Sequence, residues 1–382
     1  MITNDILYVG VNDRDIDLFE GQYIVPNGMA YNSYVICDEK IAIMDTVDKR
    51  KQEEYMANLD KALNGKSPDY LIVSHVEPDH ASSVKALLDK YPQTVPVGNA
   101  KTFQMLAQYF DLDLNHARTI KEGDTLSLGK HELRFIMAPM VHWPEVMLTY
   151  DSYDKVLFSA DAFGKFGALD ADESWTCEAR RYYFNIVGKF GMPVQAVLKK
   201  AADLDIQIIC PLHGPVLKEN LSFYLEKYQI WSSYEPESEG VFIAYASLHG
   251  NTADAVKKLE EILLAKNCPK VAIADLARDD MAEALEDAFR YGKIVLAASS
   301  YNGGVMPFME DFLHHLKGKS FQKRTVALVE NGSWAPSAKK TMTEILSQMK
   351  DISILPSSVT IRGVMKEENI TEMNALADEL LK

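Results

Sequence analysis

Residues 70–80 read YLIVSHVEPDH, an apolar run followed at once by four side chains that can bind a metal ion. The run predicts a buried strand, and the segment after it has the pattern of a helix. The four side chains are His75, Glu77, Asp79 and His80. In an extended loop, 75, 77 and 79 can point the same way while His80 turns to the other side of a common centre. Such a loop could serve two adjacent metal ions, and a solvated loop with a helix-capping histidine is the plainer alternative.

Three more candidate ligands also follow predicted strands in the first half of the chain. They are His142 in MVHWPE, Asp161 in FSADAFG and His213 in CPLHGP. Singly, each could be a structural residue. The chain has only nine histidines, and four of them lie at strand ends, so the set indicates a joint site.

The region up to about residue 230 contains many short strands and few crossover helices. This pattern favours two sheets stacked face to face with helices outside. The expected strands are Asp5–Gly10, Tyr34–Cys37, Ile41–Asp45, Tyr70–Ser74, Leu133–Met137, Val146–Tyr150, Val156–Ser159 and Ile206–Cys210, and the expected helices lie near 51–63, 81–90, 100–109, 194–203 and 216–231.

The polar tract WSSYEPESEG (231–240) interrupts this pattern, and we expect two domains, 1–236 and 237–382. After it, strands and helices alternate regularly from Val241 to the last residue. Five such β-α units predict a flavodoxin-like, doubly wound parallel sheet of strand order 2-1-3-4-5.

Three loops of the second domain predict a flavin site. SLHGNT (247–252) resembles the flavodoxin loop that binds the FMN phosphate, and it lacks the GKS/T signature of a Walker A loop. SSYNGG (299–304) and ENGSWAP (330–336) follow the third and fourth strands, and each supplies an aromatic ring to lie against isoalloxazine. A plain strand–helix turn or an unliganded aromatic is the alternative at each loop. The expected contacts are Ser247, Leu248, His249, Gly250, Asn251, Thr252, Ser300, Tyr301, Asn302, Gly303, Gly304, Asn331, Gly332, Ser333 and Trp334.

The net charge of −15 argues against nucleic acid and anionic membrane as partners. The N-terminus lacks the pattern of a signal peptide, so we expect a cytoplasmic protein. The four cysteines form no CxxC and are expected to be buried free thiols. His116 and His131 lie in polar stretches and are expected at the surface, while His314 and His315 are expected on a helix as structural or solvent-facing residues.

The order HxExDH … H … D … HGP resembles the metallo-β-lactamase-like αββα domain of flavodiiron proteins (A-type flavoproteins). The resemblance implies one iron ion on His75, Glu77 and His142, a second on Asp79, His80 and His213, and Asp161 bridging them. Ordinary members of that fold carry a histidine where Glu77 stands and usually hold zinc. An oxygen donor there favours iron or manganese. The interval from Asp161 to His213 is shorter than in some relatives.

By this resemblance the chain is an oxidoreductase that passes electrons from FMN to the di-iron centre and reduces dioxygen to water, nitric oxide to nitrous oxide, or both. It further implies a head-to-tail homodimer or dimer-based tetramer, and a separate electron donor such as rubredoxin or a reduced deazaflavin. Two alternatives remain: a zinc hydrolase of the metallo-β-lactamase fold with an appended flavodoxin domain, and an electron-transfer module with a vestigial metal site.

Overall fold

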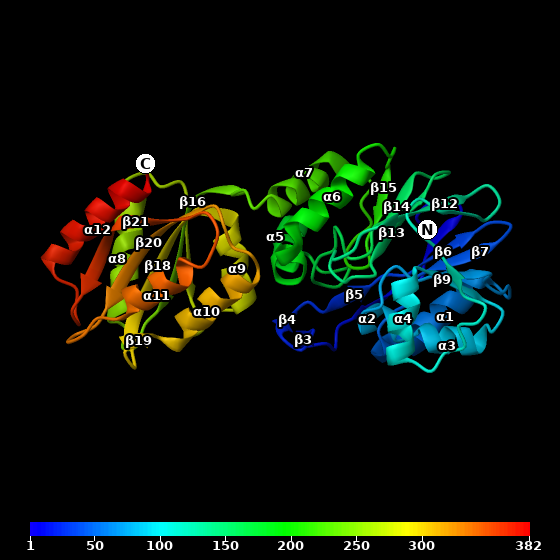
Figure 1. Ribbon diagram of the computed structural model, residues 1–382, viewed down its shortest axis with the longest axis horizontal. Coiled ribbons are helices and arrows are strands. Elements are labelled where there is room, and N and C mark those ends of the chain that lie inside the picture. The colour runs from blue at the N-terminus through cyan, green and yellow to red at the C-terminus, as the bar shows by residue number, and fades with distance from the viewer. The chain divides into compact units, whose positions relative to one another are not determined.

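The computed structural model describes residues 1–382, which form two compact units. Unit 1 comprises residues 1–183 and 190–229, and unit 2 comprises residues 184–189 and 230–382. The domain boundary expected after residue 236 stays a prediction. Figure 1 labels the helices and most of the strands of both units.

Unit 1 is built on two stacked sheets, which confirms the expected αββα class. The six-stranded sheet has the order β1-β6-β7-β8-β9-β10, and the five-stranded sheet runs from β11 to β15. Their bounds are β1 Ile6–Tyr8, β6 Tyr34–Cys37, β7 Ile41–Met44, β8 Tyr70–Ile72, β9 Val95–Gly98, β10 Arg118–Thr119, β11 Thr125–Ser127, β12 Glu132–Met137, β13 Met147–Asp151, β14 Val156–Phe158 and β15 Ile208–Cys210.

The core of unit 1 lies between these sheets because each strand turns apolar side chains inward. Tyr34 and Ile72 from one sheet and Phe135 and Phe158 from the other belong to one buried cluster. The helices lie outside the sheets (Figure 1). They are α1 Gln52–Leu63, α2 Pro78–Ala81, α3 Val84–Lys90, α4 Ala100–Tyr109, α5 Trp175–Tyr182, α6 Gly191–Ala201 and α7 Leu221–Ser232, the last extending into unit 2.

Strand directions bring the candidate ligands of unit 1 to one edge. β14 runs parallel to β15 and antiparallel to β13, so the start of β13 lies beside the ends of β14 and β15. The backbone N–H of Met147 at the start of β13 donates to the carbonyl of Ser74 after β8, at 3.1 Å. Residues after β8, before β13, after β14 and after β15 therefore gather at this edge. The turn from β13 to β14 and the start of β12 lie at the opposite edge.

Unit 2 is the expected doubly wound parallel sheet. Its strand order is β17-β16-β18-β20-β21, which is 2-1-3-4-5 in chain order. The strands are β16 Ser238–Ala246, β17 Val271–Asp275, β18 Tyr291–Tyr301, β20 Arg324–Asn331 and β21 Ile352–Ile361, with the short β19 Gly304–Val305 paired to β18. Helices α8 Asn251–Ala265 and α12 Glu367–Leu380 cover one face, and α9 Met281–Arg290, α10 Pro307–Gly318 and α11 Ala338–Leu346 cover the other (Figure 1).

A short piece of chain, residues 184–189, belongs to unit 2 although it lies between two helices of unit 1 in the sequence. Phe184 stacks on Phe289 with ring centroids 4.2 Å apart and planes at 11°. The side-chain amide of Asn185 donates to the carbonyl of Ala282 at 3.1 Å. This segment includes a π-helical turn, Tyr183–Val187.

The sequence predicted the long strands well and missed short ones. Helix α5 and eight strands were not expected: β2 Val11–Asp13, β3 Leu18–Phe19, β4 Tyr23–Ile24, β5 Met29–Tyr31, β9, β10, β11 and β19. These elements are too short, or their apolar and polar residues are too mixed, for hydrophobic periodicity to predict them. The surface position expected for His131 is wrong, because its side chain is fully buried. None of the four cysteines forms a disulfide; Cys210 and Cys268 are buried, whereas Cys37 and Cys177 are partly exposed. No helix is both long and apolar enough to cross a membrane.

Candidate metal centre and cofactor pocket

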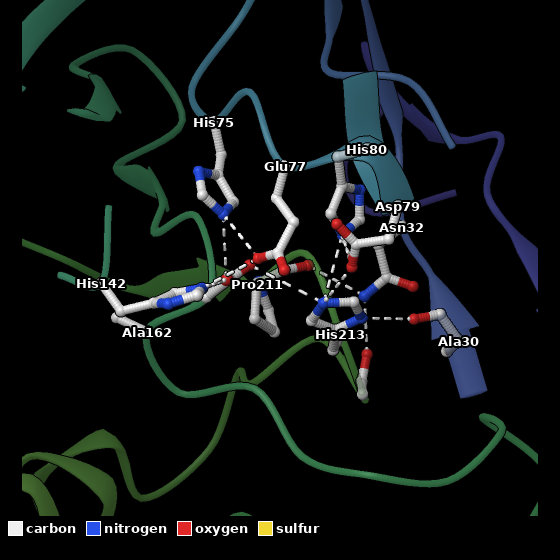
Figure 2. Close-up of polar contacts among 12 residues, drawn as sticks. Ala30, Asn32, His75, Glu77, Asp79, His80, His142, Ala162, Pro211 and His213 are labelled. Atoms are coloured by element: carbon white, nitrogen blue, oxygen red, sulfur yellow. Dashed lines mark hydrogen bonds and ion pairs between the residues drawn. The ribbon is translucent and has the colours of Figure 1, made fainter. Parts of the chain in front are cut away.

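All seven predicted ligands of unit 1 meet at the edge described above, in two groups. Figure 2 shows His75, Glu77 and His142 on one side and Asp79, His80 and His213 on the other. The first group, completed by Asp161, and the second group each have ligand atoms within 4.8 Å of one another. Most of these side chains are buried, with Glu77 and Asp79 slightly open to solvent.

In the first group, ring nitrogens and carboxylate oxygens converge on one point. The Nε2 atom of His75 lies 3.1 Å from Glu77 Oε2 and 3.5 Å from Asp161 Oδ2. The Nε2 atom of His142 lies 3.0 Å from Glu77 Oε2 and 3.1 Å from Asp161 Oδ2. Atoms bound at right angles to one metal ion at about 2.1 Å would be about 3 Å apart, so the spacing suits shared coordination.

The second group has the same character and shares Asp161 with the first. His213 Nε2 lies 3.2 Å from Asp79 Oδ2 and 3.2 Å from His80 Nε2. The other oxygen of Asp161, Oδ1, lies 3.7 Å from His213 Nε2. The two carboxylate oxygens of Asp161 therefore face different groups, which is the arrangement of a bridging ligand.

In three of the histidines, Nδ1 lies beside a hydrogen-bond acceptor, and this contact fixes the tautomer of the ring. Nδ1 of His75 lies 2.9 Å from Glu145 Oε1, Nδ1 of His80 lies 3.1 Å from the Thr46 carbonyl, and Nδ1 of His213 lies 2.8 Å from the Ala30 carbonyl. Because these oxygens can only accept, each Nδ1 carries the proton and each Nε2 of a neutral ring keeps its lone pair for a metal ion.

Without a cation, this centre would be costly. In neutral rings the Nε2 lone pairs of His80 and His213 would face each other at 3.2 Å. Both carboxylate oxygens of Asp79, Oδ1 of Asp161 and Nε2 of His142 are buried with no hydrogen-bond partner. Each buried polar group left without a partner costs about 1–3 kcal/mol, and a charged group costs more. These orphaned atoms fit a pair of metal ions.

The pKa shifts of His142 and Asp161 also indicate that positive charge is stabilised at this centre. Burial opposes protonation of His142, but the Asp161 and Glu77 carboxylates outweigh it and raise its pKa to about 9. Burial opposes ionisation of Asp161, but the nearby positive charges of His75, His142 and His213 hold its pKa well below the usual range. The carboxylates thus favour a proton on His142, at a nitrogen where a metal ion would otherwise supply the positive charge.

The extended-loop geometry expected for residues 75–79 is wrong at its end. Pro78 occupies the first turn of α2, a position that suits its fixed φ and missing N–H, and the chain turns helical there. The helical turn places Asp79 with His80 rather than with His75 and Glu77. Local helix formation thus separates one short motif into two ligand groups.

Two positioning residues were missed from the sequence. Glu145 is fully buried and accepts hydrogen bonds from His75 Nδ1 and, at 2.8 Å, from the backbone of Val76. Asn32 donates to the carbonyls of Pro211 and Gly214, both at 2.8 Å, and so holds the turn that carries His213 (Figure 2). The only feature of the sequence that could have indicated Glu145 is its position, three residues after His142 and directly before an apolar strand.

Tyr182 on α5 is a third neighbour of the centre that the sequence did not indicate. Its ring lies 5.5 Å from that of His213, and its hydroxyl is buried without a hydrogen-bond partner. Burial, together with the charges of Asp161 and Asp79, raises the pKa of Tyr182 well above its usual value. The phenol therefore stays protonated beside the ligand cluster.

Unit 2 contains a cavity of about 620 Å³ formed by the three predicted flavin loops. Its lining includes twelve of the fifteen expected residues: Leu248, His249, Asn251, Thr252, Ser300, Tyr301, Asn302, Gly303, Asn331, Gly332, Ser333 and Trp334. Ser247, Gly250 and Gly304 do not line it. Ser299, Ala335, Ser337 and Gly363 line it and were not expected.

The first loop of this cavity has the form of a phosphate site. Gly250 precedes α8 with φ of 92°, a left-handed conformation that glycine adopts without strain. The hydroxyl of Ser247 accepts a hydrogen bond from the Gly250 N–H at 3.1 Å, which stabilises the turn. Asn251 and Thr252 at the N-terminus of α8 line the cavity, so the positive end of the helix dipole lies beside it.

Comparison with known proteins gives consistent relatives. A family model described as ODP family beta lactamase matches residues 29–214. An anaerobic nitric oxide reductase flavorubredoxin of Vibrio vulnificus is 31% identical over 351 residues, covering 87% of this chain and 70% of that protein. A nitric oxide reductase of Moorella thermoacetica is 29% identical, covering 97% of this chain and 94% of its own length. The solved rubredoxin:oxygen oxidoreductase of Desulfovibrio gigas shares the fold, with a TM-score of 0.92 and 24% identity, over 100% of this chain and 97% of its own.

Proposed function

Because this chain belongs to the flavodiiron protein family and is an oxidoreductase, we propose that it reduces dioxygen to water, nitric oxide to nitrous oxide, or both, with FMN and two iron ions. The observation that carries this proposal is the pair of ligand groups joined by Asp161, with Glu77 in one of them. Similarity to named nitric oxide reductases supports the choice of substrate class.

We assign the ligands as the two groups divide them. One iron ion would be held by His75, Glu77 and His142 and the other by Asp79, His80 and His213, with one oxygen of Asp161 available to each. Two imidazoles with carboxylates and open positions are a donor set typical of non-haem iron. Glu77 is the residue that argues for iron over zinc, because a carboxylate is a harder donor than imidazole.

Bound FMN would supply two electrons that can be released singly, and two iron ions would supply a redox-active site for a diatomic molecule. The residues of the chain prepare this chemistry. Glu145 and two backbone carbonyls keep the imidazoles in one orientation. The ring of Trp143 packs edge-on against His75 at 5.2 Å and helps to exclude water from that side.

In unit 2, the cavity of about 620 Å³ is the proposed FMN site. The turn before α8 would hold the phosphate, and Tyr301 and Trp334 would lie against the ring. Gly332 permits close approach of the backbone, since a Cβ there would meet Pro336 Cα and Ser300 Oγ at 2.9 Å. The side chain of Trp334 is 90% exposed in the single chain.

Replacing Glu145 by glutamine is expected to weaken metal binding about 10–100-fold, because the buried partner of a ligating histidine loses its charge. Iron retention during dialysis against a chelator measures the effect. The control is Glu122→Gln, which alters a half-exposed carboxylate paired with Lys200. Equal iron retention in the Glu145 variant, the control and the unmodified protein would contradict this role for Glu145.

Replacing Trp334 by alanine is expected to weaken FMN binding about 3- to 10-fold, since a ring pair contributes about 0.5–1.5 kcal/mol. Quenching of flavin fluorescence gives the Kd. The control is Phe308→Ala, which removes another partly exposed aromatic of unit 2 that does not line the cavity. If both variants bind FMN as the unmodified protein does, the ring contact is not made.

We also propose a head-to-tail homodimer, or a tetramer of such dimers, in which the flavin of one copy serves the metal ions of the other. The exposure of Trp334 at the rim of the cavity supports it, because such a surface is readily covered by a partner. Mixing a metal-deficient His75→Ala chain with a flavin-deficient Gly332→Val chain should restore turnover if subunits exchange. Absence of restored turnover despite subunit exchange would oppose this arrangement.

The decisive experiment compares dioxygen and nitric oxide as substrates. Protein and a reduced rubredoxin, the proposed electron donor, are prepared anaerobically, and each gas is then added separately. Steady-state turnover with at least one of them is expected. The proposal fails if the reduced protein is reoxidised by neither gas faster than free FMN. Two zinc ions with no iron, together with thioester or lactam hydrolysis, would instead establish the hydrolase alternative.

A further inference from the structure

His131 stands apart from the centre above and has one ring nitrogen without a partner. Its side chain is fully buried at the start of β12. Nδ1 donates to Asp151 Oδ2 at 2.9 Å, so a neutral ring carries its lone pair on Nε2. Nε2 is buried with no hydrogen-bond partner, and Asp5 Oδ2 at 3.6 Å is too far to accept one.

The carboxylates of Asp5 and Asp154 lie close to this nitrogen. Asp5 precedes β1, and Asp154 lies in the turn between β13 and β14, so three distant segments converge here. The ligand atoms of His131, Asp5 and Asp154 lie within 4.8 Å of one another. A cavity of about 420 Å³, lined by residues 1–5 with Tyr153 and Asp154, opens beside the two carboxylates and gives access from solvent.

The geometry points to a site for a single divalent transition-metal ion, and we propose that His131 Nε2, Asp5 and Asp154 hold it, with water from the cavity completing the shell. One imidazole with two carboxylates suits Zn²⁺ and similar ions. The contact from buried Asp151 to the back of His131 is the carboxylate–histidine–metal arrangement that orients ligating imidazoles.

Lys130 supplies the charge that the ion would bring. Its ammonium lies 2.5 Å from Asp5 Oδ2, and the Thr3 hydroxyl donates to Asp154 Oδ2 at 2.5 Å. Neither group reaches the Nε2 lone pair of His131, which is therefore available to a cation. Binding therefore requires Lys130 to release Asp5, and the lysine acts as a competitor.

This site is separate from the di-iron centre. His131 and Asp154 lie at one end of the β12–β13–β14 meander, and His142 and Asp161 lie at the other. The five residues of β13 span roughly 17 Å. The inference therefore does not depend on the proposed function of the chain.

Zinc uptake by the full, iron-loaded chain tests the proposal. After equilibrium dialysis against Zn²⁺, elemental analysis should find one more zinc per chain in the unmodified protein than in the D5N/D154N variant. The control is Asp205→Asn, which removes an exposed, lysine-paired carboxylate elsewhere in unit 1 and should keep that zinc. Equal zinc in the unmodified protein and the double variant would overturn the proposal.

Two further variants separate this site from misfolding and from the di-iron centre. Lys130→Met should tighten zinc binding at least severalfold, whereas Lys155→Met, which loses a similar pair with Asp205, should not change it. His75→Ala should lose iron and keep this zinc. Zinc affinity that is unchanged or lower in Lys130→Met would overturn the assignment of Asp5 as a ligand. Zinc lost together with iron in His75→Ala would contradict a separate site.

Discussion

Replacing Asp161 by asparagine is expected to reduce turnover with dioxygen or nitric oxide at least about 1,000-fold, since metal ions supply several kcal/mol of the stabilisation that the reaction needs. The carboxylate is almost completely buried, and its two oxygens face different ligand groups. An amide offers a single neutral oxygen and cannot serve two cations. Iron content should fall below two ions per chain.

The control for this experiment is Asp13→Asn, which neutralises another buried carboxylate of unit 1 that belongs to neither ligand group. That variant should keep both iron ions and its turnover. If Asp161→Asn retained two iron ions and full turnover, the assignment of a bridging carboxylate would be wrong.

Glu77→His is expected to shift the metal preference from iron to zinc and to abolish reductase turnover. The variant would give the first group three imidazoles and one carboxylate, a softer donor set. Reconstitution with equal amounts of ferrous and zinc ions, followed by elemental analysis, measures the preference. We expect the ratio of iron to zinc to fall at least about tenfold, corresponding to about 1.4 kcal/mol.

Glu77→Asp is the matched control, because it keeps the carboxylate and changes only its reach. Its iron preference should remain close to that of the unmodified protein even if turnover declines. A Glu77→His chain that keeps both iron and turnover would show that the glutamate does not select the metal.

Where strands are apolar and the candidate ligands follow them directly, the sequence predicted which side chains lie together. His75, Asp161 and His213 each come soon after a buried strand, and parallel or antiparallel pairing then places them at one edge. The partition of the ligands was harder. The grouping of Asp79 with His80 depends on a single helical turn that begins at Pro78, which a strand-based pattern does not reveal.

Contacts made by tertiary folding could not be predicted in this way. Glu145 meets His75 across 70 positions of sequence, and Asn32 meets the His213 turn across 179. His131 was misjudged because its sequence neighbours are polar, whereas burial is decided by Asp151 and by the N-terminal segment folding over it. Local composition carries no information about such partners.

The short segment 184–189 has a consequence for dissecting the protein by gene truncation. A chain cut to start at residue 230 would lack this segment, and with it the ring stacked on Phe289, the amide bonded to Ala282 and the Gly188 carbonyl that accepts from the Tyr234 hydroxyl at 2.8 Å. The polypeptide passes between the units three times, so no single cut releases either unit whole. Neither unit is built from one continuous stretch of chain, and unit 2 isolated by simple truncation would lack part of its own core.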